Sequence, residues 1–326
     1  MIEKLYCAIS PYTDPYLNLA LEKELCQMVP SSSCLLLLWK NASTVVIGKN
    51  QNPWAECNWE EISARAVFFA RRESGGGAVY HDSGNLNFTF ITQPENFDLD
   101  KQLSVVIHAC RTLGICALSS GRNDLLADGR KFSGSAFLHK KGYSLHHGTI
   151  LIDTDLEVME KLLSPSKSKL SAKGIRSVRS RVINLRELSP GLSVDDFQDR
   201  MLQAFQEVFK IKATPFPLPE EKLLNNTKAE LQSISWLWGT TPQFDITLED
   251  RFPWGQLQLS FQIKSLTILS VSAFSDALDP DLANKLIQAL SGCCLQENAL
   301  KQALQQAELP KEVTEDIEKL LYKLIK

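Results

Sequence analysis

Apolar residues recur along this chain with two different periods, and the longer period predicts helices. In Leu17–Met28 the apolar side chains fall at positions 17, 19, 21, 25 and 28, and the stretch follows an Asp14-Pro15 start signal. A similar stripe runs through Gln102–Leu113 and through Leu156–Leu163. We therefore expect a helix over each of these three segments.

Short apolar runs bounded by turn residues predict strands. Cys34–Trp39 and Thr44–Lys49 are separated by a short polar turn and are expected to pair, and Ala66–Ala70 and Leu86–Ile91 are two further strands. The segment Ala213–Pro219 contains three prolines. Proline excludes a helix interior or a central strand, so we expect a connection there.

The last quarter of the chain has a pattern of its own. Gln256–Ile263 and Ser265–Ala273 are predicted strands, and three helical stretches follow between Pro280 and Lys326. Strands and helices mixed in this way predict the α+β class. We expect two domains, a large one over residues 1–250 and a small α+β one over residues 251–326.

Charge is distributed unevenly along the 326 residues, although the net charge is only −3. Such a balance argues against global electrostatic binding to nucleic acid. Between residues 161 and 186 there are eight Lys or Arg and no Asp or Glu. Ser, Gly and Pro interrupt this basic run, so it is either a loop that closes over a charged ligand or a solvated basic face.

The cysteines and the N-terminus predict a cytoplasmic protein. Eight cysteines show neither CxxC nor zinc spacing, and several lie within apolar runs, as reduced thiols do. The first residues lack the apolar region of a signal peptide, and no run is long and apolar enough to span a membrane. P-loop and Rossmann glycine motifs are also missing from the sequence.

The segment Arg71–Asp82 has the clearest chemical signal, because two arginines precede three consecutive glycines. Glycine reaches positive φ without strain and has no side chain, so such a turn can present backbone N–H groups to phosphate or carboxylate oxygens. Arginines beside it add bidentate donors. A glycine-rich hairpin between the flanking strands is the plainer interpretation, and the two are compatible.

A second block runs from Gly121 to Ala136. An Asp128-Gly129 turn is expected to join two short strands, and Lys131 begins the second strand, ahead of small residues that let a substrate lie close. A lysine there can neutralise a carboxylate and a phosphate as they meet, or it is a solvated charge at a strand end.

A third block, His146–Ile152, places two histidines before a buried strand. No Cys, His or Glu stands at ligand spacing from the pair, which disfavours metal binding there.

Together the three blocks resemble the lipoate–protein ligase A family of the biotin/lipoate ligase superfamily. The blocks read RRESGGGAVYHDSGN, GRNDL with KFSGSA, and HHGTILI. The resemblance also covers residues 10–20, 44–58, 173–182, 236–239 and 251–255. Glu73, where the family has a small polar residue, and a shorter turn at 127–129 depart from the pattern.

The family resemblance implies a fold and a reaction. The fold is a mixed-sheet biotin/lipoate-ligase catalytic domain with a small C-terminal α+β domain. In the reaction lipoate is activated with ATP to lipoyl-AMP, and the lipoyl group passes to a lysine on lipoyl domains of 2-oxoacid dehydrogenase E2 subunits or on the glycine-cleavage H protein. ATP and Mg²⁺ are then required, with no tightly bound prosthetic group, no nucleic acid and no membrane.

The resemblance also implies the site. Lys131 is the central contact to carboxylate and α-phosphate, and Asp124 holds Mg²⁺, orients Lys131 or caps a turn. ATP contacts are expected from Arg72, Gly77, Ala78, Val79, Tyr80 and Lys131. Lipoate contacts are expected from Ser74, Gly75, Gly76, His81, Lys131, His147, Gly148 and Thr149. An adenylate-binding loop would include Lys173, Arg176, Arg179 and Arg181. Candidates for the apolar tunnel are Val45, Val46 and Phe88–Phe90.

Rival functions stay open at this point. A lipoyltransferase that uses only preformed lipoyl-AMP would carry similar motifs, and release of pyrophosphate from ATP separates the two. A non-catalytic lipoate- or adenylate-binding protein is disfavoured because Lys131 is present. Biotin ligases have a different Arg/Gly loop, and octanoyl transferases generally lack the C-terminal domain.

Overall fold

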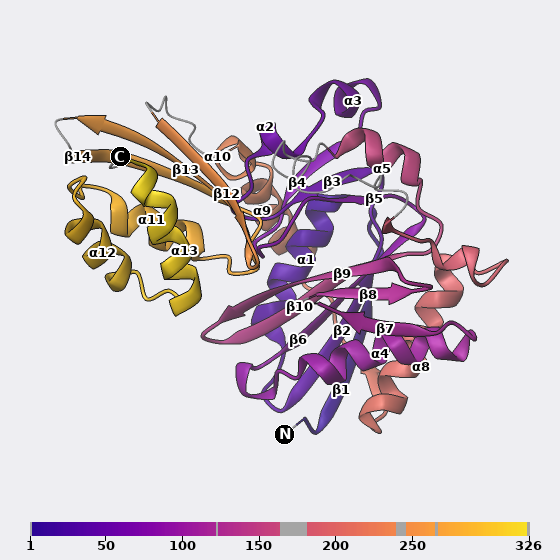
Figure 1. The fold of residues 1–326 in the computed structure, drawn as a ribbon. Coiled ribbons are helices and arrows are strands. Elements are labelled where there is room, and N and C mark those ends of the chain that lie inside the picture. The colour runs from indigo at the N-terminus through magenta and orange to yellow at the C-terminus, as the bar shows by residue number, and fades with distance from the viewer. Residues whose placement is uncertain (1, 122, 164–180, 239–245, 265–266, 325–326) are drawn as a thin grey trace.

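The computed structural model describes residues 2–121, 123–163, 181–238, 246–264 and 267–324 (Figure 1). Its centre is a mixed eight-stranded sheet in which β1 pairs in parallel with β2 and β11, whereas all other neighbours are antiparallel. In order across the sheet, the strands are β11 (Ala213–Pro215), β1 (Lys4–Ile9), β2 (Ser33–Trp39), β6 (Asn85–Thr92), β10 (Tyr143–Leu151), β9 (Arg130–Lys140), β8 (Asp124–Ala127) and β7 (Ala117–Ser120).

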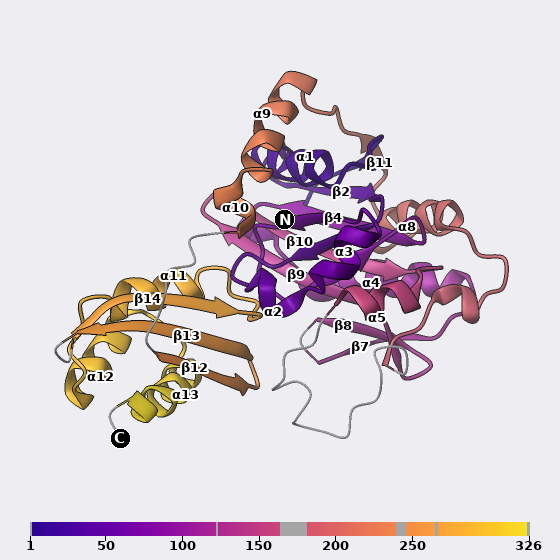
Figure 2. The same ribbon diagram turned by 90° about the horizontal axis from the view of Figure 1, so that it is seen from above.

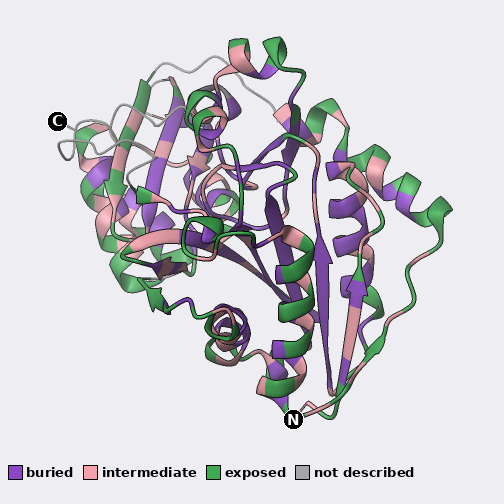
Figure 3. Ribbon diagram, turned by 90° about the vertical axis from the view of Figure 1, so that its right-hand side faces the viewer, coloured by how far each residue is buried: buried purple, intermediate pink, exposed green. Residues whose placement is uncertain are grey.

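Helices cover both faces of this sheet because its strands carry apolar residues on both sides (Figure 3). The helices α4 (Leu99–Thr112) and α8 (Val194–Phe209) pack on one face, and α1 (Pro15–Met28) and α9 (Glu221–Leu231) on the other. The predicted helices of the first half are present, and Asp14 caps α1 by accepting from two backbone amides. Phe88 and Phe90 point to the α4 and α8 side, so their predicted place in a ligand tunnel is wrong.

A small three-stranded sheet lies over the α1 side of the large one. It consists of β4 (Phe68–Arg71), β3 (Thr44–Ile47) in the centre and β5 (Val79–His81). Behind it lie α2 (Pro53–Glu56), α3 (Trp59–Ala64), α5 (Leu156–Leu162) and α10 (Ile234–Trp238). The expected pairing of Cys34–Trp39 with Thr44–Lys49 is therefore wrong, since the two strands belong to different sheets. The glycines do not close a hairpin either, because β4 and β5 flank β3 and β6 lies in the large sheet.

The C-terminal elements have their own core, built around Leu257, Phe261, Leu286 and Ile317. Its elements are β12 (Ile246–Phe252), β13 (Gly255–Lys264), β14 (Thr267–Ser275), α11 (Leu282–Leu290), α12 (Glu297–Gln306) and α13 (Lys311–Leu321). The two predicted strands and three helices are present. Sequence reasoning missed β12, which is mostly exposed and so lacks an apolar signal. It crosses residue 250, and the predicted domain division stays a prediction.

The C-terminal elements form a separate group beside the rest of the chain (Figure 2). They contact the glycine loop, which we define as residues 74–78, and the neighbouring residues 49 and 50. The Gly76 amide donates to the Ala277 carbonyl at 2.9 Å, and the Ser275 amide donates to the Asn50 carbonyl at 2.6 Å. Lys49 Nζ lies 3.2 Å from an Asp281 carboxylate oxygen. The glycine loop is thus supported from outside by a C-terminal segment.

Short 3₁₀ helices complete the described chain at Pro94–Asn96, Leu185–Glu187 and Tyr322–Leu324. None of the helices within the described ranges has the length and apolar character needed to cross a membrane. All eight cysteines are described, and each is a free thiol.

Candidate active site

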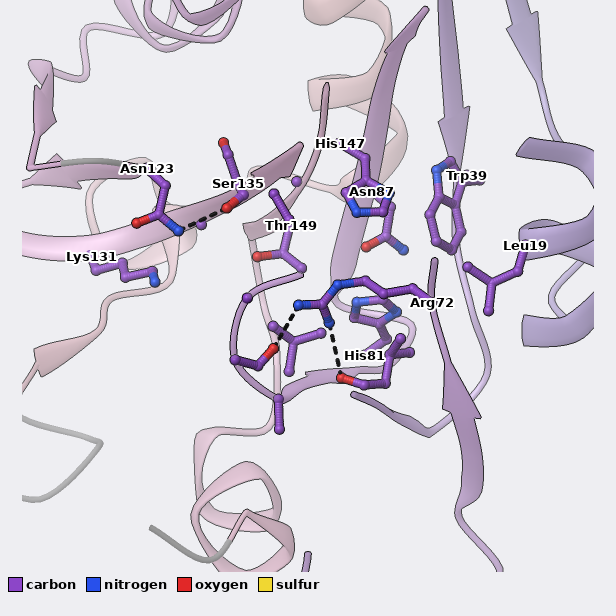
Figure 4. Close-up of a pocket in the computed structure, with 18 residues that line it drawn as sticks. Leu19, Trp39, Arg72, His81, Asn87, Asn123, Lys131, Ser135, His147 and Thr149 are labelled. Carbon is purple, nitrogen blue, oxygen red and sulfur yellow. Dashed lines mark hydrogen bonds between the residues drawn. The ribbon is translucent and has the colours of Figure 1, made fainter. Parts of the chain in front are cut away.

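A pocket with about 620 Å³ of empty space, partly open to solvent, lies between the two sheets (Figure 4). The large sheet supplies its floor, and the small sheet and glycine loop supply its roof. Ten of the predicted site residues line it, namely Arg72, Gly76, Gly77, Ala78, Val79, His81, Lys131, His147, Gly148 and Thr149. The further lining residues are Leu19, Trp39, Val46, Asn87, Asn123, Gly134, Ser135 and Ala136.

Cross-strand register builds the floor of the pocket. Trp39 lies opposite Asn87, Asn87 opposite Thr149, and Thr149 opposite Gly134. Directly opposed residues project to the same face of a sheet, so these four positions form one row over four strands. The row continues to Asp124, which lies opposite Gly134. An aromatic residue thus stands at one end of the row and a carboxylate at the other.

Lys131 reaches the row through an irregularity in β9. The register with β8 shifts between Leu125 and Leu126, which places one extra residue in β9 next to Lys131. Such a bulge redirects the neighbouring side chains. Lys131 Nζ lies 2.7 Å from Asp124 Oδ1 and 2.7 Å from the place that a Cβ on Gly134 would take. The missing side chain of Gly134 makes room for the ammonium group.

Three roles were left open for Asp124. The ion pair with Lys131 is the contact that Asp124 needs in order to orient that lysine. A single carboxylate is also compatible with Mg²⁺ carried by ATP, because that ion is commonly held by one or two carboxylates together with substrate phosphates. Among the described residues, no group of three or more His, Cys, Asp or Glu side chains gathers into a metal site.

Arg72 is buried and directs its donors at the glycine loop. Its Nη2 donates to the carbonyl oxygens of Gly75 and Gly77 at 2.7 and 2.8 Å, and its Nε donates to Ser74 Oγ at 3.0 Å. Burial lowers the pKa of Arg72 to about 10, so the side chain stays charged at neutral pH. Arg71 is held similarly by the carbonyl oxygens of Gly48, Lys49, Gln51 and Leu237. The expected contact of Arg72 with ATP stays a prediction.

A buried hydrogen-bond chain connects the loop to α1. Ser74 Oγ lies 2.7 Å from His147 Nε2, and His147 Nδ1 lies 2.8 Å from Glu22 Oε1. Glu22 also accepts from Thr89, whose hydroxyl accepts from the Trp39 indole. Ser74 lies behind the main pocket, in a second cavity that shares His147 and Arg72 with it. This chain fixes the position of the His147 ring.

His81 and Asn87 each bring a buried nitrogen to the pocket. His81 Nδ1 is 3.0 Å from the Asn41 amide, and Asn87 Oδ1 accepts from Asn85 at 3.0 Å. Burial lowers the pKa of His81 to about 3, with smaller contributions from the charges of Arg72 and His147. His81 Nε2 and Asn87 Nδ2 have no hydrogen-bond partner within the part of the chain that the structure describes.

Three of the predicted site residues also pack closely against other parts of the structure, and their ligand contacts stay predictions. Tyr80 packs in the core behind the small sheet, with its hydroxyl 3.3 Å from Ser43 Oγ. Gly75 is covered by the C-terminal segment, since a Cβ there would approach the Ala277 carbonyl oxygen to 2.3 Å. Gly148 lies over Phe88, where a Cβ would meet the ring at 2.6 Å. Glycine at both positions is explained by close packing.

Glu73 turns away from the glycine loop. Its carboxylate lies 2.9 Å from Lys140 Nζ and 3.5 Å from Lys23 Nζ. Burial would raise the pKa of Glu73, but the hydrogen bonds and charges of the two lysines outweigh it and lower the pKa. The negative charge of Glu73, which departs from the family pattern, is thus neutralised by the two neighbouring lysines.

The predicted adenylate loop is largely outside the described residues, since Lys173, Arg176 and Arg179 all lie there. Arg181 is described and exposed. Directly after it, Val182 forms a bridge with Lys131, and the Ile183 amide donates to the Lys131 carbonyl at 2.9 Å. The chain therefore returns from residues 164–180 beside the pocket lysine.

Sequence reasoning missed Leu19, Trp39 and Asn87 as pocket residues, and Glu22 in the cavity behind the pocket. Each of them lies in an element predicted from its apolar residues, and the apolar pattern does not show which of these residues face a pocket. A polar residue within an apolar strand, such as Asn87, was the available signal for a pocket position. The apolar pocket wall comes from Leu19, Trp39 and Val46, of which only Val46 was a tunnel candidate.

Comparisons with known proteins cover most of the chain. The model of the lipoyl protein ligase A/B catalytic domain matches residues 14–206, and that of the bacterial lipoate protein ligase C-terminus matches residues 241–325. A lipoate-protein ligase A from Psychrobacter cryohalolentis is 39% identical over 298 residues, which are 88% of this chain and 88% of that protein.

Solved structures show the same fold. The P. falciparum protein LipL1, in complex with lipoate, superposes with a TM-score of 0.83 at 27% identity and covers 97% of this chain and 98% of its own. A bi-partite lipoate protein ligase from Thermoplasma acidophilum, described with its E2 lipoyl domain, gives a TM-score of 0.65 at 25% identity over 76% of this chain and 100% of its own. The predicted α+β fold with a mixed large sheet and a small C-terminal domain is confirmed.

Proposed function

The chain belongs to the lipoyl protein ligase A/B family, and from this premise we propose that it activates lipoate with ATP to lipoyl-AMP and pyrophosphate, then transfers the lipoyl group to a protein lysine. Lipoate ligation follows from the family. The adenylate intermediate, the requirement for Mg²⁺ and the acceptors are the parts that we propose.

One observation carries the proposal: the pocket has a cationic end and an apolar end. Lys131 Nζ lies over Gly134 beside Asp124, while Leu19, Trp39 and Val46 line the opposite part. A carboxylic acid with an apolar tail fits such a pocket in one direction only. Its carboxylate lies at Lys131, where a nucleotide phosphate has to meet it.

In the first step a lipoate carboxylate oxygen bonds to the α-phosphorus of ATP, and pyrophosphate leaves. Two anions approach each other in this step, so a fixed cation between them stabilises the transition state, and losing such a donor costs about 10²–10³-fold in rate. Lys131 supplies the cation, and Asp124 orients it. Mg²⁺ bound to the nucleotide would offset further phosphate charge.

In the second step a lysine amine of the acceptor bonds to the carbonyl carbon of lipoyl-AMP, AMP leaves, and the amine loses a proton. The mixed anhydride is already activated, so no nucleophile of the enzyme is needed. We propose lipoyl domains of 2-oxoacid dehydrogenase E2 subunits and the glycine-cleavage H protein as acceptors. The match to a ligase described with its E2 lipoyl domain supports the first of these.

Three further expectations remain proposals. The basic segment containing Lys173, Arg176, Arg179 and Arg181 binds the adenylate, which is supported by the return of the chain to Lys131 at Val182. Residues 1–250 form the catalytic domain and 251–326 an accessory one. The reaction takes place in the cytoplasm, as eight free thiols would favour.

Mass spectrometry of the products tests the proposal. The purified protein is mixed with ATP, Mg²⁺ and lipoate without any acceptor, and lipoyl-AMP and pyrophosphate are expected. If neither forms, but synthetic lipoyl-AMP and a lipoyl domain give lipoylated product, the protein is a lipoyltransferase and the ATP-dependent step is absent.

A further inference from the structure

Two buried nitrogen atoms in the pocket wall lack an acceptor within the described part of the chain. Asn87 is 1% exposed and His81 is 3% exposed, and both line the pocket. Neither Asn87 Nδ2 nor His81 Nε2 has a hydrogen-bond partner among the described residues. Buried donors are normally paired, so the two atoms point to an acceptor that arrives with the ligand.

The hydrogen bonds around His81 determine that its free nitrogen is a donor. Asn18 Nδ2 donates to Asn41 Oδ1 at 2.8 Å, so the other atom of the Asn41 amide, Nδ2, is the one that faces His81 Nδ1. An amide nitrogen only donates. Nδ1 therefore accepts, and the proton of the neutral ring is on Nε2.

Asn85 Oδ1 is likewise without a partner among the described residues. Asn87 Oδ1 accepts from Asn85 Nδ2 at 3.0 Å. Its own amide nitrogen is the remaining polar atom, and it projects from the floor row between Trp39 and Thr149 (Figure 4). His81 lies beside the same tryptophan, with ring centroids 5.9 Å apart. The two donors therefore belong to one part of the pocket.

That part receives the tail of the acid and not its charged end. Asn87 is two strands away from Gly134, where Lys131 Nζ lies. Adjacent strands are about 4.8 Å apart, so the separation is about 10 Å. With the carboxylate at Lys131, the carbon tail extends past Thr149 to Asn87, His81 and Trp39.

We propose that Asn87 and His81 make this pocket select an acid whose tail carries hydrogen-bond acceptors over a plain fatty acid. The inference rests on the proposed function and names the determinant of its substrate choice. The two ring sulfur atoms of lipoate are such acceptors, although divalent sulfur accepts only weakly. Octanoate has the same number of carbons and only hydrogen atoms along its tail, so it would bury both donors without a partner.

Most of the discrimination against octanoate comes from the two donors that it leaves unpaired. A buried donor covered by hydrocarbon loses its bond to water and gains nothing, whereas a weak acceptor restores part of that loss. One buried donor left unpaired discriminates by about 5–150-fold. With two such donors partly satisfied by weak sulfur acceptors, we expect the protein to prefer lipoate over octanoate by about 100-fold.

The test compares kcat/KM for adenylate formation with lipoate and with octanoate, in the wild type and in Asn87→Leu. Leucine keeps the volume and removes the donor, so the preference for lipoate should fall about 10-fold, mainly because octanoate improves. Thr92→Val is the matched control. Thr92 lies on the same strand, is fully buried and has an unpaired hydroxyl, but it does not line the pocket, so its substitution should leave the preference within twofold.

Calorimetric binding of each acid without ATP separates this inference from the proposed function. If no adenylate forms but Asn87→Leu still weakens the preference in binding, the proposed reaction fails and the inference stands. If adenylate forms and Asn87→Leu leaves the preference unchanged, or Thr92→Val shifts it equally, the inference is overturned. Asn87→Ala replaces Asn87→Leu if the leucine variant melts early, with the same outcomes.

Discussion

Arg72 and Lys131 are both cations of the same pocket, yet they are held in opposite ways. Arg72 is 6% exposed and its guanidinium donates to carbonyl oxygens of the glycine loop. The side chain of Lys131 is 38% exposed, and its ammonium is paired with one carboxylate, Asp124. The first cation is a part of the wall, and the second lines the pocket with its ammonium partly exposed.

Charge beside a glycine-rich loop is therefore not by itself a ligand contact. An arginine offers five N–H donors in one plane. It can therefore bridge several carbonyl oxygens of a tight loop. A lysine on a flexible stem carries a point charge that a substrate can share. We therefore propose that Arg72 holds the shape of the glycine loop and that Lys131 neutralises the charge of the ligand.

Replacing Arg72 should have the largest effect on stability. Arg72→Ala leaves the carbonyl oxygens of Gly75 and Gly77 buried without their donors, so the free energy of unfolding should fall by about 3–5 kcal/mol. Urea denaturation measures it. Arg72→Lys is the control for charge and should recover less than half of the loss, because an ammonium cannot reach both oxygens. Full recovery by lysine would show that charge alone matters.

Acid should have the next largest effect, through two buried histidines, His81 in the pocket and His146 in the core beside Phe88 and Phe90. Burial lowers the pKa of His81 and of His146 to about 3, whereas an unfolded histidine has a pKa of about 6.5. Below pH 6.5 the unfolded chain binds more protons, so this stability is present above pH 6.5 and is lost as the pH falls toward 3.

The expected slope is up to about 1.4 kcal/mol per pH unit for each histidine. Urea unfolding at pH 7.5 and at pH 5.5 measures it. His146→Gln keeps polar atoms for Gln102 and Ser135, the partners of the ring, and should reduce the slope. Equal unfolding free energies at the two pH values would contradict the burial argument.

Gly134→Ala should displace the ammonium group of Lys131 and lower activity without changing the stability of the protein. The new Cβ would lie 2.7 Å from Lys131 Nζ, and the ammonium is the free end of a flexible side chain, so it moves aside. Adenylate formation should fall about 10-fold, a part of the loss expected for removing a central donor. The melting temperature should stay within about 2 °C, since alanine is tolerated in a strand. Unchanged activity would show that the position of the ammonium is not critical.

Glu73→Gln should have the smallest effect. The carboxylate is held by Lys140 and Lys23 outside the pocket, and partly exposed ion pairs contribute only about 0.2–1 kcal/mol. Adenylate formation should stay within twofold of the wild type. A large gain in ATP affinity would mean that the carboxylate acts on the glycine loop after all.

The sequence predicted the elements better than their partners. The helix after Asp14 and the turn at Asp128-Gly129 follow from local signals, and both are present, with positive φ at both turn residues. Periodicity cannot tell which strand lies beside which. The pairing of Cys34–Trp39 with Thr44–Lys49 failed for that reason, since β3 is the centre of a separate sheet.

Site residues that belong to one sequence motif could be predicted. Site residues that are brought together by several strands could not. Lys131 and the glycines could be found from their own segments. The row of Trp39, Asn87, Thr149 and Gly134 exists only through register across four strands. The bulge that turns Lys131 toward Gly134 leaves no mark in the sequence either.

The most direct test of the account is the rate of lipoyl-AMP formation by Lys131→Ala, measured by mass spectrometry beside the melting temperature of the same sample. The account predicts a native melting temperature and a rate lower by about 10²–10³-fold. A folded Lys131→Ala protein that forms lipoyl-AMP at the wild-type rate would contradict it.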